Sequence, residues 1–297
     1  MDRRYTEKAS LAELTAAYSN TPRAVAAPLL RFTGELLQIQ AGWTRLPAAE
    51  ATLNDSLSSR LEAGEPLIAL AEIAADGTLD LDQVRTALAS VLSLISRWYK
   101  GGSNGDGFPD ALTLPLEQIS SGLQALFNRR TVPGWVRRVD PCLQELVVFS
   151  LGAALSPFVQ ALAAPAAEVL RERRYDKASC PACGQQPLMG MLHGEGGVRS
   201  VECWLCRTQW IIPRVACPFC CTTQQADLRY FYVPGREDAR AYVCGNCKRY
   251  LKVTDARRLG FKPLLALEHV VTMPLDSMAA AEGYRPGCAP LFLASKF

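Results

Sequence analysis

Eight of the eleven cysteines of this 297-residue chain form four Cys-x-x-Cys pairs within residues 180–247. A two-residue gap bends the backbone into a knuckle that aims both sulfur atoms at one point, and two knuckles supply the four thiolates of a tetrahedral metal site. The eight cysteines therefore predict two metal ions. The predicted ligands are Cys180, Cys183, Cys203, Cys206, Cys217, Cys220, Cys244 and Cys247.

Loop length indicates how the four pairs combine. The intervals 183–203 and 220–244 each have the length of a short β-hairpin, so joining successive pairs costs the least loop-closure entropy. The first site then takes the first two pairs along the chain, and the second site takes the last two. The alternative is an interleaved arrangement that joins the second pair to the third, because only a short segment separates them.

Residues between the knuckles predict short strands. Residues 228–233 and 239–243 are apolar and aromatic, and they flank the turn Pro234-Gly235-Arg236. Valine, tryptophan and isoleucine residues flank the first two knuckles in the same way. This layout is typical of two zinc-ribbon-like or rubredoxin-like modules in tandem. Such modules bury few apolar residues, so the metal must supply much of their folding free energy, about 10 kcal/mol per site.

Four-cysteine sites restrict the chemistry. Four thiolates suit zinc and iron equally well in geometry, so the ligands alone leave the metal open. A closed four-cysteine shell has no position for a substrate, which argues against Lewis-acid catalysis. Iron would support electron transfer or oxygen sensing, and zinc a structural role. Because no Ser-His-Asp or paired-carboxylate pattern is legible either, we expect a binding protein rather than an enzyme.

The residues before the cysteines predict helices almost throughout. Capping signals occur at Thr21-Pro22, at an aspartate in position 80 or 82, and at Asp140-Pro141. A glycine-rich run, 101–107, predicts a loop, and Cys142 is expected to be a small buried residue. The other predicted helices cover residues 9–18, 48–62, 116–127 and 166–173, followed after the cysteines by residues 255–284 with a break at Pro274.

A chain of this length exceeds one hydrophobic core. The predicted fold class is multidomain, α plus small metal-bound β: an all-α helical domain, two tandem rubredoxin/zinc-ribbon-like modules and a short C-terminal helical segment. The predicted domains are residues 1–176 (helical), 177–254 (metal ribbons, 177–214 first and 215–254 second) and 255–297 (C-terminal helical segment and tail).

Net charge and hydropathy restrict the kinds of partner that the protein is expected to bind. The formal net charge is +3, but eight thiolates and two divalent ions change it by −4, to about −1. A nearly neutral protein is not expected to bind nucleic acid through a basic surface. Residues 146–167 carry no charge and are long enough to cross a bilayer, yet their alanine, glycine, serine and proline content favours a buried helix. We expect no membrane span.

Cysteine usage and the N-terminus predict the compartment. Chelating cysteine pairs are typical of reducing environments, where disulfides are rare. Residues 1–18 contain no continuous apolar segment and no small-residue cleavage site of a signal peptide. The protein is therefore expected to be cytoplasmic.

Longer motifs surround the cysteines. They are Cys180-Pro181-Ala182-Cys183-Gly184, Gly197-Val198-Arg199, Cys203-Trp204-Leu205-Cys206-Arg207-Thr208-Gln209-Trp210, Val215-Ala216-Cys217, Cys244-Gly245-Asn246-Cys247, Tyr250-Leu251-Lys252 and Glu282-Gly283-Tyr284. Together they resemble the FdhE family, the formate dehydrogenase accessory proteins of bacteria, most specifically over residues 180–285.

The resemblance implies a function and a metal. It implies a cytoplasmic assembly factor needed for active respiratory formate dehydrogenase, which binds the catalytic subunit of that enzyme during maturation. It also implies rubredoxin-like centres that take iron, so iron is favoured over zinc. Two departures concern the second site: Cys221 places a ninth thiol beside Cys220, and no glycine follows its two pairs, unlike Gly184 after the first. Both departures concern the expectation of iron at the second site.

Two other functions stay open. A nucleic-acid-binding module would use arginines and lysines such as Arg199 beside aromatic residues such as Trp204, Trp210 and Tyr230. A dithiol oxidoreductase would use the Cys-x-x-Cys pairs directly, but the βαβ context of such enzymes is missing. The two histidines are expected to be structural or solvated. The oligomeric state does not follow from the sequence.

Overall fold

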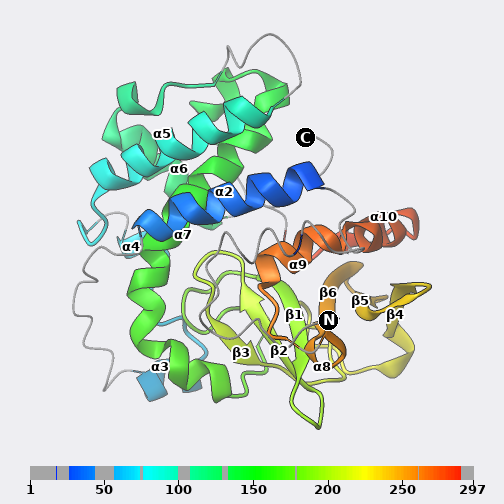
Figure 1. The fold of residues 1–297 in the computed structure, drawn as a ribbon. Helices are drawn as coiled ribbons and strands as arrows, with labels where there is room; N and C mark the ends of the chain where they lie inside the picture. The colour runs from blue at the N-terminus through cyan, green and yellow to red at the C-terminus, as the bar shows by residue number, and fades with distance from the viewer. Residues whose placement is uncertain are drawn as a thin grey trace. The chain divides into compact units, whose positions relative to one another are not determined.

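The computed structural model describes residues 18, 27–43, 57–73, 76–99, 108–128, 133–177, 179–259 and 261–288 (Figure 1). Its described residues form two compact units. A helical unit contains those between 35 and 165, and a sheet unit contains those up to 34 and from 166 onward. The predicted boundaries at residues 176 and 254 stay predictions. The predicted N-cap at Thr21 and the predicted loop at 101–107 lie outside the described residues.

Helices dominate the N-terminal half, as the sequence predicts. The α-helices are α2 (Ala27–Trp43), α3 (Leu57–Ala63), α4 (Leu70–Ile73), α5 (Leu81–Trp98), α6 (Leu116–Asn128) and α7 (Pro141–Glu172), with short 3-10 helices η1 (Ala111–Thr113) and η2 (Val136–Arg138). The most amphipathic of them, α5, buries one face that includes Val84, Leu88 and Ile95. The predicted helix over residues 116–127 is confirmed as α6.

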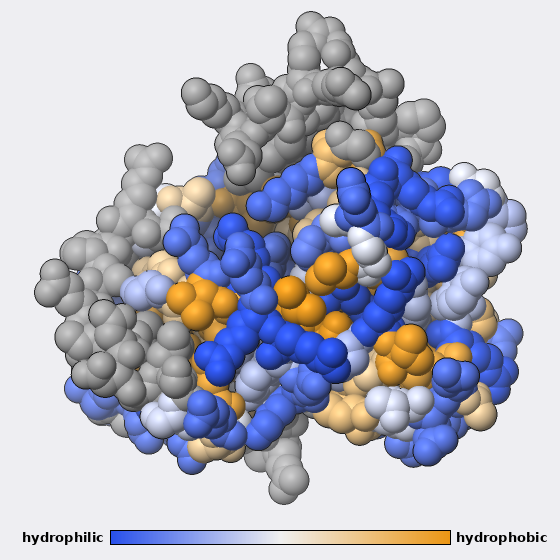
Figure 2. All heavy atoms as spheres, turned by 90° about the horizontal axis from the view of Figure 1, so that it is seen from below, coloured by the Kyte–Doolittle hydropathy of each residue, from blue (hydrophilic) through white to orange (hydrophobic). Residues whose placement is uncertain are grey.

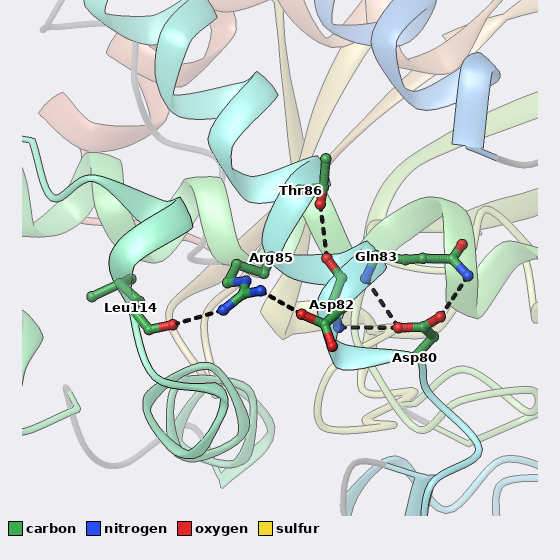
Figure 3. A network of polar contacts seen from close by, with 6 residues as sticks. All are labelled: Asp80, Asp82, Gln83, Arg85, Thr86 and Leu114. Atoms are coloured by element: carbon green, nitrogen blue, oxygen red, sulfur yellow. Dashed lines mark hydrogen bonds and ion pairs between the residues drawn. The ribbon is translucent and has the colours of Figure 1, made fainter.

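Aspartate caps begin two of these helices. The Asp80 carboxylate accepts hydrogen bonds from the backbone N–H groups of Asp82 and Gln83, each at 3.1 Å, and from the Gln83 side chain (Figure 3). Asp140 accepts from the N–H of Cys142 at 2.8 Å. These carboxylates pair amides that have no partner inside the helix. Both predicted caps are confirmed, with Asp80 rather than Asp82 as the N-cap.

The apolar segment predicted to be a buried helix lies within α7. This helix is long and apolar enough to cross a membrane, but 78% of its most apolar stretch is buried inside the protein. Leu146, Val147 and Leu155 are fully buried, as expected for a core helix. Cys142, in contrast, is exposed, because it lies in the first turn, ahead of the buried stretch. Its predicted burial is wrong.

The cysteine region forms one seven-stranded mixed sheet. Its strands are β1 (Pro187–His193), β2 (Val198–Cys203), β3 (Gln209–Ile211), β4 (Leu228–Val233), β5 (Arg236–Cys244), β6 (Arg249–Asp255) and β7 (Arg285–Pro286). They lie in the order β3-β2-β1-β6-β5-β4, with β7 beside β6. Strands β1 to β3 belong to the first predicted ribbon and β4 to β6 to the second, so the tandem arrangement is confirmed.

The two ribbons are joined by a parallel pair of strands. Gly190 of β1 pairs with Val253 of β6, followed by Met191 with Thr254 and Leu192 with Asp255. A β-carbon at Gly190 would lie 3.1 Å from the Ser200 carbonyl oxygen and 3.1 Å from Val253 Cγ2. The close approach of these strands therefore depends on glycine at this position.

The C-terminal segment packs on the sheet. It forms α8 (Ala256–Leu259), α9 (Leu265–Val271) and α10 (Met273–Ala281). Leu275 and Ala279 of α10 join a core cluster with Ala241, Val243 and Tyr250 of the sheet. The predicted helical run breaks at Thr272, two residues before Pro274, and also between Leu259 and Leu265. Pro274 itself lies in the first turn of α10, where its missing N–H costs nothing.

A buried ion pair ties α10 to the sheet. Lys252 Nζ lies 2.7 Å from Asp276 Oδ2 and donates to the His269 carbonyl at 2.6 Å, while the Tyr250 hydroxyl donates to Asp276 Oδ1 at 2.9 Å. The Lys252 side chain is 1% exposed. Removing one member of such a pair costs about 3–5 kcal/mol, because the other charge stays buried.

Replacing Gly190 by valine should weaken the sheet at the joint between the two ribbons. We expect Gly190→Val to lower the free energy of unfolding by about 1–3 kcal/mol, because the added side chain overpacks the space between β2 and β6. Gly196→Val is the matched control, since a β-carbon at Gly196 meets nothing within 4 Å. Urea denaturation followed by circular dichroism measures both. Equal stability of the two variants would contradict the tight joint.

Candidate metal centres

The structure brings the eight predicted cysteines into two groups. The first group is Cys180, Cys183, Cys203 and Cys206, and the second group is Cys217, Cys220, Cys244 and Cys247. All sulfur atoms within a group lie within 4.8 Å of one another. The pairing is the sequential one rather than the interleaved alternative.

The distances between sulfur atoms fit a metal ion. In a tetrahedral site with metal–sulfur bonds of about 2.3 Å, neighbouring sulfur atoms lie about 3.8 Å apart. The measured separations are 3.6 Å for Cys180 and Cys206, 3.5 Å for Cys183 and Cys203, 3.6 Å for Cys217 and Cys247, and 3.7 Å for Cys220 and Cys244. A disulfide would need about 2.0 Å. Both groups can therefore hold a metal ion, and ligation itself stays a prediction.

Each group closes the end of a β-hairpin. Cys203 ends β2 opposite Pro187 of β1, and Cys244 ends β5 opposite Leu228 of β4. The other knuckle of each group lies in the turn just before the first strand of its hairpin. A metal ion in either group would thus pin two strand ends that hydrogen bonds alone hold in register.

The four knuckles share a left-handed residue directly after the second cysteine. It is Gly184 with φ of 74°, Arg207 with 58°, Cys221 with 58° and Lys248 with 57°. At Gly184, Cys221 and Lys248 this residue donates its N–H to the carbonyl of the first cysteine, at 2.8 to 3.0 Å. Only the first knuckle carries the glycine that this conformation favours. The other three knuckles adopt the same geometry with side chains present.

Backbone N–H groups point at the sulfur atoms. Leu205 N–H donates to Cys203 Sγ at 3.4 Å, and Phe219 N–H donates to Cys217 Sγ at 3.4 Å. Each donor lies two residues after the cysteine it contacts, so the knuckle itself provides the contact. Such bonds stabilise thiolate over thiol and tune a bound metal.

The groups differ in burial. All four cysteines of the first group are buried, whereas Cys220 and Cys247 of the second group are partly exposed. Burial raises the pKa of the Cys180 and Cys183 thiols, because a lone thiolate loses its hydration there. A bound cation reverses this penalty, so filling the first group must release protons. The second group is open to solvent on one side.

Cys221 lies outside the second group. Its side chain is exposed, and its Sγ contacts the Asp176 carbonyl oxygen at 3.4 Å. Its backbone is left-handed, with φ of 58°, like that of the residue after each of the other three pairs. Cys221, the ninth thiol, is therefore the left-handed residue that ends its knuckle. The sequence analysis missed this role, which its position directly after a Cys-x-x-Cys pair indicates.

The aromatic residues near the cysteines are divided between core and surface. Trp204, Trp210 and Tyr250 are at most 5% exposed, while Tyr230 and Tyr232 are 48% and 43% exposed. The buried ones pack between strands and cannot stack on bases. Arg199, among the cations considered for nucleic acid, is buried as well. Burial therefore removes part of the surface that a nucleic-acid-binding module would need, while Tyr230 and Tyr232 stay exposed.

The two histidines belong to neither sulfur group. Burial, helped by Lys262, lowers the pKa of His193. Burial also lowers the pKa of His269 well below its usual value, and its Nδ1 has no hydrogen-bond partner among the described residues. Both imidazoles are therefore neutral at neutral pH. Neither belongs to a cluster of ligating side chains in the described part of the chain.

The comparisons with known proteins agree with the motifs around the cysteines. Residues 179–214 match the family model described as FdhE, central domain. The chain is 30% identical over 184 residues to the FdhE homolog of Stutzerimonas stutzeri, covering 60% of this chain and 58% of that protein. It is 32% identical over 126 residues to the FdhE homolog of Pseudomonas putida, covering 39% of each. The aligned segments thus span from two fifths to somewhat more than half of these relatives.

A solved structure resembles the whole fold. The crystal structure of the FdhE protein from Pseudomonas aeruginosa matches with a TM-score of 0.67 and 22% identity, covering 97% of this chain and 95% of that chain. At this identity the match shows the shared fold. Together with the family model and the curated relatives, it confirms the resemblance to the FdhE family that the cysteine motifs indicate.

Cys221→Gly should stabilise the second knuckle pair without loss of metal. A left-handed backbone costs a residue with a side chain about 1–2 kcal/mol, and glycine removes this cost. Part of the gain is lost again, because glycine makes the unfolded chain more flexible. We expect a gain of about 0.5–1 kcal/mol in the free energy of unfolding and an unchanged content of two metal ions per chain. Thermal denaturation and elemental analysis measure these. Loss of one ion would instead identify Cys221 as a ligand.

A chelator should remove the two ions at different rates. The second group has two partly exposed cysteines, so we expect its ion to leave first and the ion of the buried first group to leave at least about tenfold more slowly. Alkylation of the thiols freed at each stage, followed by peptide mass spectrometry, assigns each phase to a group. Simultaneous release from both groups would contradict the difference in access.

Proposed function

We propose that this chain, a relative of the FdhE proteins, is a cytoplasmic accessory factor for the maturation of formate dehydrogenase. One observation carries the proposal: two closed four-cysteine groups, in the arrangement that the FdhE-like motifs specify, on a fold shared with an FdhE crystal structure. A closed shell leaves no position for a substrate. The arrangement therefore suits binding and ordering of a partner protein rather than turnover.

The proposed partner is the catalytic subunit of formate dehydrogenase. The chain would bind this subunit in the cytoplasm, before its export in folded form, and hold it while its cofactors are inserted. The metal-bound sheet gives a rigid platform, because each ion fixes the end of a hairpin. The exposed side chains suit a soluble protein: Figure 2 shows a mainly hydrophilic face on which apolar residues form small, separate patches.

Iron is the proposed resident metal, with zinc as the alternative. Either metal fits four thiolates in a tetrahedron. The N–H groups of Leu205 and Phe219 at 3.4 Å from sulfur support iron, because such bonds stabilise the charge that a redox-active thiolate site carries. Iron would add one-electron transfer to the binding role, and zinc would leave the sites structural. Visible absorption of freshly purified protein separates the two, since only ferric thiolate sites are coloured.

Loss of the chain in its native host should leave formate dehydrogenase made but inactive. We expect the catalytic subunit to be present at near-normal amounts in a deletion strain, with formate-dependent dye reduction in membranes at least about tenfold lower. Wild-type chain restores the activity, and a Cys217→Ser/Cys220→Ser variant does not, because the second group loses half of its ligands. Cys142→Ser, at an exposed cysteine outside both groups, is the matched control and restores activity.

The same strains test binding. Affinity-tagged wild-type chain should co-purify with the catalytic subunit identified by mass spectrometry, and the double cysteine variant should retain at most a tenth of it. Normal formate dehydrogenase activity in the deletion strain would contradict the proposed function. So would the absence of the catalytic subunit from the proteins that co-purify with the tagged chain. Salt-sensitive binding of RNA or DNA in place of the subunit would favour the nucleic-acid alternative.

A further inference from the structure

Arg199 is a buried cation with an incomplete set of partners. It lies in β2, and its side chain belongs to a residue only 3% exposed. One of its nitrogen atoms, Nη1, donates to the carbonyl oxygens of Arg214 at 3.3 Å and Ala216 at 3.2 Å. The other two, Nε and Nη2, are buried and have no hydrogen-bond partner among the described residues. A guanidinium in this position leaves donors unpaired.

Arg199 also lacks a carboxylate. The other deeply buried cation, Lys252, has Asp276 at 2.7 Å, and the half-buried Arg207 has Glu202 at 3.2 Å. No acidic side chain of the described residues forms an ion pair with Arg199. Burial lowers its pKa to about 10, so the guanidinium is still charged at neutral pH. A buried charge without a counter-charge is strongly unfavourable, so the folded protein needs one nearby.

The surroundings of Arg199 indicate where that counter-charge lies. Ala216, whose carbonyl it binds, directly precedes Cys217. Its guanidinium stacks 4.8 Å from the centre of the Tyr242 ring, and Tyr242 precedes Cys244 by two residues. Four thiolates around one divalent ion carry a net charge of −2, so a filled second group supplies the missing negative charge.

The first group has a different environment. Cys206 Sγ lies 3.1 Å from the Thr208 hydroxyl, and Cys203 accepts the Leu205 N–H. Arg207, the cation next to Cys206, is already paired with Glu202. Arg199, by contrast, binds the carbonyl of Ala216, the residue before Cys217 of the second group. We therefore expect Arg199 to act on the second group.

We propose that Arg199 is the charge-compensating residue of the second metal centre. Its guanidinium stabilises the dianionic metal–thiolate complex of Cys217, Cys220, Cys244 and Cys247, and its two carbonyl bonds hold the segment that delivers Cys217. The proposal rests on the proposed metal binding and is independent of the partner protein. It makes Arg199 a positioning residue that raises the affinity of this centre for a divalent ion.

Zinc affinity of the purified protein tests the proposal. The wild-type chain and three variants are loaded with Zn²⁺ and titrated with a competing chelator, and the thiols freed at each step are alkylated and identified by mass spectrometry. We expect Arg199→Met to raise the dissociation constant of the second group at least about tenfold and to leave the first group unchanged. Arg258→Met is the matched control, because its side chain is 54% exposed and lies 3.8 Å from the Asp255 carboxylate, and we expect it to change neither group.

Arg199→Lys separates the effect of the positive charge from the effect of the guanidinium hydrogen bonds. It also provides a second test if Arg199→Met does not fold. It keeps the cation but loses the guanidinium nitrogen Nη1 that donates to both carbonyls, so we expect the dissociation constant of the second group to rise by at most about threefold. Three results would overturn the proposal: an unchanged second group in Arg199→Met, equal weakening of both groups, or a tenfold loss in Arg199→Lys. Because no partner protein is present, failure here differs from failure of the proposed function.

Discussion

Convergence of four sulfur atoms on one point is the constraint around which the sheet unit is built. Each group joins a knuckle before a hairpin to a knuckle after it, so the strands between them must be antiparallel and of matched length. The register obeys this: Cys203 lies opposite Pro187, and Cys244 opposite Leu228. Burial raises the pKa of the Cys180 and Cys183 thiols, so without an ion these two side chains hold their protons. An ion bound by all four sulfur atoms would turn separate side chains into a cross-link between strand ends.

The parallel pairing of β1 with β6 joins the two ribbon modules into one sheet. The two backbones approach closely at Gly190. The Lys252–Asp276 ion pair then holds α10 against the sheet. A ribbon alone exposes both faces of a small hairpin, which is marginal in water. Shared strands and a helix with Leu275 and Ala279 in the core supply the apolar burial that each ribbon lacks. The two metal groups are thus coupled through one sheet rather than strung on a linker.

Features set by local chemistry were predictable from the sequence, and features set by distant partners were not. Spacing of the cysteine pairs predicted the two groups, and Asp80 and Asp140 predicted helix starts, because each signal acts within a few residues. The pairing of β1 with β6 escaped prediction, since parallel strands need no turn between them and leave no turn signature. The left-handed conformation of Arg207, Cys221 and Lys248 was not predicted, because in a sequence only glycine indicates that backbone conformation.

The difference between the two groups suggests a division of roles. All four cysteines of the first group are buried, so we expect a metal ion there to exchange slowly and to hold the fold. The second group is partly exposed and faces the buried charge of Arg199, an environment that favours the more negative state of a metal–thiolate complex. We therefore expect any chemistry of a bound metal, beyond holding strands together, at the second group, where Cys220 and Cys247 are partly exposed.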